Sequence, residues 1–225
     1  MTSMNLPTQE DQLNWVIKGI KYAIYKRISP GITHDLVGPL SVALIQAGII
    51  KRKLKADTHQ ASELLENAIN LENYIKQTVL MIRAMKSWDS PNTPIFDVQN
   101  VYRQCIKFFQ TRLAMRGIDL IVIESVHENT IMYNFQAFLY SWLGLLCYLE
   151  DMVKTPKDLH IQQLENNTIS IWLKDKQIIE NPVGEISTRI ENQSEESIGS
   201  QELSILSQHY STTFEFNESG ILFRW

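Results

Sequence analysis

The stretch ITHDLVGPLSVALIQAGIIKRKLK, residues 32–55, decides the fold class of this chain. Its apolar residues recur at alternating steps of four and three, the heptad spacing of one helical face: Leu36, Leu40, Ala43, Ala47, Ile50 and Leu54. A polar break at residues 56–58 precedes a second helix, expected to extend to about Lys86. Its stripe consists of Ala61, Leu64, Leu65, Ala68, Leu71, Ile75, Val79 and Ile82. Two consecutive amphipathic helices joined by a short turn predict a helical hairpin.

Both apolar stripes of this hairpin are long, and two helices alone do not cover them. Pairing with a second copy would bury them in a four-helix bundle, so we expect a homodimer. The alternative is that the hairpin packs on the rest of its own chain. A further amphipathic helix is expected at about residues 10–28, with an interruption at Ser29-Pro30-Gly31 before the hairpin begins.

A linker rich in proline and turn residues at 87–94 divides the chain. We therefore expect a helical domain at residues 1–88 and a second domain at 95–225. In the second domain, Asp97 is expected to cap a helix that ends near Arg116 and Gly117. The remaining patterns predict a buried strand at 118–123, an apolar helix at 132–153, a hairpin at 159–164 and 168–174, a polar loop at 191–200, a helix at 202–210 and strands at 213–216 and 221–225. This mixture predicts an α+β sandwich, so the fold class of the whole chain is α+β.

Composition and charge exclude several classes of function. The net charge of −4 argues against nucleic acid as the main partner, because phosphate binding needs a basic surface. Cys105 and Cys147 lie in apolar helical patterns without CxxC spacing, so we expect reduced core thiols and no metal site. No signal peptide is evident, and the apolar run at residues 137–149 is shorter than the roughly 20 residues that span a bilayer. We therefore expect a cytoplasmic protein that does not bind membranes.

His34 is the candidate functional residue. It lies two positions before Leu36, a rotation of about 200° at roughly 100° per residue, so it should face solvent. The positions that follow on its face are Gly38, Ser41, Ile45 and Gly48, almost all small. A glycine inside a helix costs about 1 kcal/mol relative to alanine, so two on one exposed face suggest close docking of a partner.

Pro39 distinguishes His34 from an ordinary surface histidine. A proline inside a helix removes a hydrogen bond and clashes with the carbonyl four residues back, here that of Asp35, which predicts a kink beside the histidine. A lone exposed histidine usually has no function, and this is the interpretation for His59, His127, His160 and His209. The kink and the small face favour a role for His34.

The run from Thr33 to Leu40 resembles the phosphoacceptor box of sensor histidine kinases, which reads His, an acid, Leu, two variable residues, Pro, Leu. It is most similar to the His-Asp-Leu form in ChpT-type histidine phosphotransferases, and a weaker similarity extends from Ser29 over most of the chain. The resemblance implies a dimer of helical hairpins, each followed by a degenerate ATP-binding-like domain of the histidine-kinase ATPase type.

The nucleotide-binding features of such kinases are missing. The stretch that corresponds to their asparagine-rich, magnesium-binding helix reads YSWLGLL at residues 140–146, without asparagine. The residues after Leu173 contain no Asp-x-Gly-x-Gly, and no glycine-rich lid precedes the last helix beyond Gly199. Phosphate binding needs unhindered backbone N–H groups. We expect no ATP binding and no cofactor of the protein's own.

The resemblance therefore implies a histidine phosphotransferase of a multistep two-component phosphorelay. Its partners would be response-regulator receiver domains and a hybrid histidine kinase, with magnesium supplied by the receiver. His34 would carry the phosphoryl group, and Asp35 would orient the imidazole or act only as an acid favoured near a helix start. Gly38, Ser41 and Ile45 would dock the receiver, and a glycine at position 38 argues against phosphatase activity.

Two other functions remain open. A non-catalytic pseudo-histidine-kinase dimer would bind or sequester a response regulator without accepting phosphate. An ATP-dependent kinase with an unusual nucleotide site is the third possibility.

Overall fold

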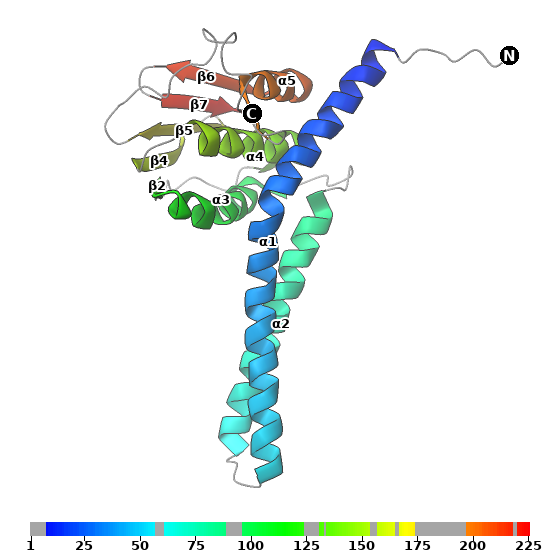
Figure 1. Cartoon of the computed structure of the whole chain (residues 1–225), viewed down its shortest axis with the longest axis vertical. Helices are drawn as coiled ribbons and strands as arrows, with labels where there is room; N and C mark the ends of the chain where they lie inside the picture. Colours follow the sequence, from blue (N-terminus) through cyan, green and yellow to red (C-terminus); the bar gives the residue numbers. More distant parts are fainter. Residues whose placement is uncertain are drawn as a thin grey trace, which may run out of the picture. The chain divides into compact units, whose positions relative to one another are not determined.

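The computed structural model describes residues 8–56, 61–88, 96–123, 131–132, 134–153, 157–164, 167–173, 197–217 and 220–225 (Figure 1). The chain forms two compact units. One contains Pro30–Asn92, and the other combines Met1–Ser29 with Thr93–Trp225. Helices make up the first of these units and a sheet with helices the second, so the α+β class is confirmed.

The helical unit is a hairpin formed by α2 (Ala61–Trp88) and by the part of α1 (Gln9–Ala56) from Pro30 onward. The predicted interruption at Ser29-Pro30-Gly31 is wrong, because α1 runs through it with Pro30 and Pro39 inside the helix. A proline inside a helix costs about 3 kcal/mol. Ile28 and Ile32, on either side of Pro30, are buried, and the burial of their side chains offsets this cost.

The boundary between the two units falls at that proline. Residues 9–29 of α1, called here the N-terminal arm, group with the sheet and not with the hairpin. The division therefore differs from the expected domains 1–88 and 95–225, in which the arm was part of the helical domain. At the other end α2 includes Trp88, and the rest of the predicted linker lies outside the described residues.

The hairpin leaves much of its apolar surface uncovered. Lys53 Nζ lies 2.5 Å from Glu63 Oε2 and joins the two helices near their turn, and Ala43 is buried. Several members of the predicted stripes are nevertheless exposed: Leu40, Leu54, Leu65, Ile75, Val79 and Ile82. A single chain therefore does not bury these stripes.

The other unit contains a five-stranded sheet in the order β2-β4-β5-β7-β6. Its strands are β2 (Ile118–Ile123), β4 (Lys157–Leu164), β5 (Thr168–Leu173), β6 (Thr213–Asn217) and β7 (Gly220–Arg224). The β2–β4 pair is parallel and the other pairs are antiparallel. A short antiparallel pair, β1 (Phe96–Asp97) and β3 (Ile131–Met132), lies outside this sheet and was not predicted.

Three helices pack with this sheet: α3 (Val98–Met115), α4 (Phe135–Met152) and α5 (Ser200–Tyr210). In Figure 1, α4 lies between α3 and α5. Trp142 of α4 is at the centre of the core. Its ring stacks on Tyr102 of α3, with 5.5 Å between the ring centroids, and on Phe223 of β7, with 6.0 Å between the centroids. Cys105 and Cys147 are buried free thiols, as predicted, and burial raises the pKa of both.

The local signals of this unit are mostly confirmed. Asp97 Oδ1 accepts a hydrogen bond from Gln99 N at 2.9 Å and caps α3, and Gly117 follows that helix with a φ of 74°. Both predicted strand pairs form. The apolar helix begins later than expected, at Phe135. Most of the predicted polar loop lies outside the described residues.

The prediction of a buried strand at 118–123 is wrong in one respect. The strand forms, but as an edge strand, and of its six residues Ile118 alone is buried. The apolar run predicted a buried strand, whereas Ile121 and Val122 are exposed.

A buried ionic network joins the N-terminal arm to α4. Arg27 Nε donates to Glu150 Oε2 at 2.9 Å, and the two terminal nitrogens of Arg27 contact both oxygens of Asp151. Arg112 donates to Glu150 Oε1 and, at 2.6 Å, to the backbone oxygen of Arg27. Arg116 Nη1 donates to the backbone oxygen of Glu150 at 2.7 Å. The Glu150 side chain is only 1% exposed, so its charge depends on these partners.

Replacing Arg27 should therefore be costly. We expect Arg27→Met to lower the free energy of unfolding by about 3 kcal/mol. The substitution removes a positively charged partner from the buried carboxylate of Glu150 and from Asp151. Urea denaturation followed by tryptophan fluorescence measures the change. The matched control is Lys76→Met, which breaks only the exposed ion pair with Glu72 and should cost no more than about 0.5 kcal/mol. Equal effects of the two substitutions would contradict a stabilising role for the network.

Candidate functional site

The imidazole of His34 is exposed, as its position relative to Leu36 predicts. Its side chain is 79% accessible on the hairpin part of α1. Nδ1 lies 3.4 Å from Oδ1 of Asp35, a half-buried neighbour, and Nε2 has no partner among the described residues. With a proton on Nδ1 facing the carboxylate, the lone pair of Nε2 would be directed to solvent and available to an electrophile.

The surface on the same face of α1 is open. A Cβ added at Gly38 would meet nothing within 4 Å. Ser41 is exposed and the Ile45 side chain is 59% exposed. The structure therefore brings Gly38, Ser41 and Ile45 together with His34 on one accessible face, and their role in docking stays a prediction.

Pro39 adds a polar group beside the histidine. Because proline has no N–H, the carbonyl oxygen of Asp35 lacks its usual partner inside α1. That oxygen belongs to the residue that follows His34. The predicted kink at this proline stays a prediction.

Residues 140–146 of α4, where the resemblance to kinases implies a magnesium-binding helix without its asparagine, lie in the core of the sheet unit. All seven residues from 140 to 146 are buried. A Cβ at Gly144 would lie 2.7 Å from Leu206 Cδ1 and 3.6 Å from Ile24 Cδ1, so α5 and the N-terminal arm both pack here. Ser141 Oγ pairs with Thr212 Oγ1 at 3.0 Å. The side chains of this segment are therefore packed in the core of the sheet unit.

One cluster of side chains in this region was missed by the sequence analysis. Lys21 of the N-terminal arm lies over the rings of Tyr140, at 4.5 Å, and Tyr210, at 5.5 Å, and donates to Gln136 Oε1 at 3.2 Å. Burial and the charge of Lys21 lower the pKa of the neighbouring His209. The sequence does contain a signal for this cluster. Lys21 lies on the apolar stripe of the arm, one turn after Ile17 and one turn before Ile24, where a buried residue is expected.

No family model and no characterised protein sequence matches the chain. Among solved structures, a bacterial phosphotransferase is similar with 10% identity and a TM-score of 0.40, over 89% of this chain and 94% of that one. The histidine kinase ThkA, solved in complex with the response regulator protein TrrA, has 16% identity and a TM-score of 0.39, over 90% of this chain and 61% of that one. The Acinetobacter baumannii histidine kinase AdeS has 12% identity and a TM-score of 0.35, over 84% and 94%. At such scores, the function of this chain has to be argued from its own residues.

Proposed function

We propose that this protein is a histidine phosphotransferase that carries a phosphoryl group on His34 between the aspartates of two receiver domains. The observation that supports it is the accessible imidazole, placed on an open helix face within a sequence that resembles the phosphoacceptor box. A buried histidine, or one covered by another segment, would not be compatible with this function.

The geometry fits an in-line displacement. The lone pair of His34 Nε2 would attack the phosphorus of a receiver's aspartyl phosphate, a P–N bond would form, and the P–O bond to the aspartate would break to release its carboxylate. Asp35 near Nδ1 would favour the tautomer with a free Nε2 and stabilise the positive charge that develops on the ring. Phosphoryl transfer depends mainly on positioning and charge neutralisation, and here the receiver would contribute the magnesium.

The phosphoryl group would come from another protein and not from ATP. The proposal is supported by the burial of residues 140–146 and by the packing of Leu206 and Ile24 against Gly144. This supports a relay protein that depends on an upstream hybrid kinase and needs no cofactor of its own. A location in the cytoplasm would fit such partners.

The exposed stripes of the hairpin support a homodimer. Leu65, Ile75, Val79 and Ile82 of α2 remain accessible in the single chain, and a bundle with a second hairpin would cover them. By length and composition, one helix among the described residues, α1, contains a segment apolar enough to cross a membrane. We attribute the apolar surface of the hairpin to pairing between two copies.

The dimer is tested by charging its proposed interface. The double variant Leu65→Glu, Ile75→Glu should give the mass of a monomer by light scattering, because two carboxylates per helix would be buried in the bundle. The control Ile121→Glu, Val122→Glu charges two exposed apolar residues of the sheet unit and should leave the dimer intact. A monomeric mass for the unmodified protein would contradict the proposal.

Phosphotransfer is tested by labelling. A receiver domain carrying radioactive aspartyl phosphate should transfer label to the wild-type protein and none to His34→Gln, which keeps a polar side chain but has no nucleophilic nitrogen. His209→Gln removes another exposed histidine and should label like wild type. If no receiver in a panel labels the protein, yet one binds it equally before and after His34→Ala, the function is sequestration of a regulator and not transfer.

The docking face is tested at Gly38. We expect Gly38→Arg to slow transfer from the receiver at least tenfold, about 1.4 kcal/mol, because a long side chain would occupy the open face beside His34. The control is Gly19→Arg, at an exposed helical glycine whose Cβ would also meet nothing within 4 Å. Circular dichroism should show that both variants keep their helices, since arginine favours a helix more than glycine does. An unchanged rate for Gly38→Arg would exclude this face as the docking surface.

A further inference from the structure

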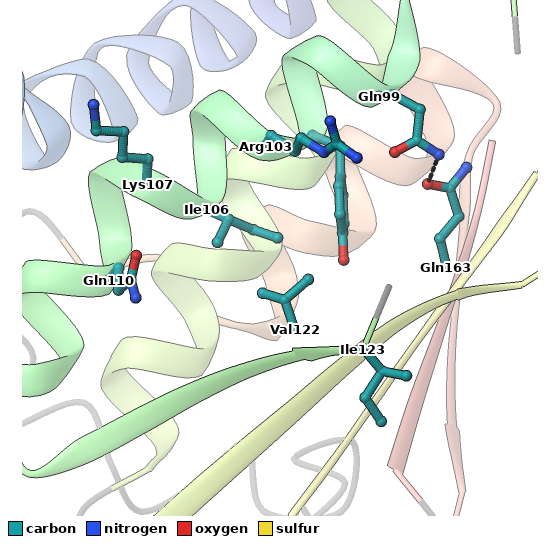
Figure 2. A pocket seen from close by; sticks show the side chains of 9 residues that line it. Gln99, Arg103, Ile106, Lys107, Gln110, Val122, Ile123 and Gln163 are labelled. Atoms are coloured by element: carbon teal, nitrogen blue, oxygen red, sulfur yellow. Dashed lines mark hydrogen bonds between the residues drawn. The ribbon is translucent and has the colours of Figure 1, made fainter. Parts of the chain in front are cut away.

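A cleft remote in sequence from His34 lies between α3 and the β2–β4 edge of the sheet (Figure 2). Its volume is about 330 Å³, near the lower end of the range of roughly 300–1,000 Å³ typical of small-molecule sites. All its walls belong to the sheet unit. The proposed phosphotransfer makes no use of it.

Tyr102 lines this cleft, and its buried hydroxyl group has no partner among the described residues. Tyr102 is 3% exposed, and its ring is fixed by stacking on Trp142. Its hydroxyl forms no hydrogen bond within the described part of the chain. Burial raises the pKa of this phenol, so the group stays protonated and can donate. An unpaired buried donor is unfavourable, and an acceptor atom of a ligand would satisfy it.

The polar rim of the cleft is positively charged. Arg103 and Lys107 are one turn apart on α3, both are exposed, and neither forms an ion pair with the described residues. Among the described residues that line the cleft, none is a carboxylate. Gln163, which is buried on β4, accepts a hydrogen bond from Gln99 Nε2 at 2.5 Å, drawn in Figure 2, so the amides at this end are held in place.

The interior surface between these groups is apolar. Ile106 projects from α3 toward Val122 on β2, and Ile123 follows on the same strand (Figure 2). Cations at the rim, an apolar surface below them and a single buried donor are together suited to a molecule with an acidic end and a hydrophobic body.

We propose that this cleft binds a small organic anion. The acidic group lies against Arg103 and Lys107, the apolar body packs on Ile106 and Val122, and an oxygen of the ligand accepts a hydrogen bond from Tyr102. The site is independent of His34, so loss of ligand binding should leave the labelling of His34 unchanged.

The proposal is tested by titrating the full-length protein, with methyl groups of isoleucine and valine labelled, and following its NMR spectrum. Benzoate and phenyl phosphate are the probes, and benzyl alcohol and benzylamine are neutral and cationic controls of similar size. We expect the anions to shift the methyl signals of Ile106 and Val122, which face each other across the cleft, and benzylamine to leave them in place. Tighter binding of benzoate would identify the acidic group of the ligand as a carboxylate, and tighter binding of phenyl phosphate would identify it as a phosphate.

Substitutions separate this site from nonspecific attraction. Arg103→Gln combined with Lys107→Gln should weaken binding of the anion at least tenfold, whereas Arg52→Gln, an exposed arginine on α1, should not change it. Tyr102→Phe should weaken binding about threefold and raise the melting temperature of the free protein, since it removes the unpaired hydroxyl while the ring can still stack. Equal affinity for benzoate and benzylamine, or an unchanged affinity in the double variant, would overturn the proposal. A higher melting temperature with unchanged affinity would exclude the hydroxyl from the site.

Discussion

The organisation of this protein depends on the carboxylate of Glu150. It is buried on the most apolar helix of the chain, where an unpaired charge would cost several kcal/mol, and it meets Arg27 from the N-terminal arm and Arg112 from α3. Because Arg112 also donates to the backbone oxygen of Arg27, the arm is held by its main chain as well as by a side chain. The network therefore selects the N-terminal arm as the segment that covers α4. Apolar packing alone would select this segment less specifically.

Once the arm is fixed in this way, the face of α4 is closed. Ile24 reaches Gly144 and Lys21 lies over Tyr140, so the arm covers this part of α4. Packing against α5 and the arm stabilises this face. The exposed imidazole of His34 lies on the other unit, on the hairpin part of α1.

The helix that carries His34 contrasts with α4. Around the histidine it contains Gly38 and Pro39, both unfavourable inside a helix, together with exposed apolar residues on the hairpin. Such a surface gains little from the chain's own packing and is suited to contact with other molecules. Stability is therefore concentrated in the sheet unit, and accessible apolar and small surfaces are concentrated in the hairpin.

Periodicity alone predicts the type and approximate limits of most elements and the exposure of His34, because it records which side of a helix or strand is apolar. The sequence also identified the cap at Asp97 and the turn at Gly117, which are local interactions. Three features emerge only in the folded chain: α1 passes through Pro30, its arm belongs to the sheet unit, and β2 is an edge strand. The physical reason is that an apolar stripe does not specify what covers it. Arg27 and Glu150 are 123 residues apart in the chain, and their pairing exists only in the folded protein.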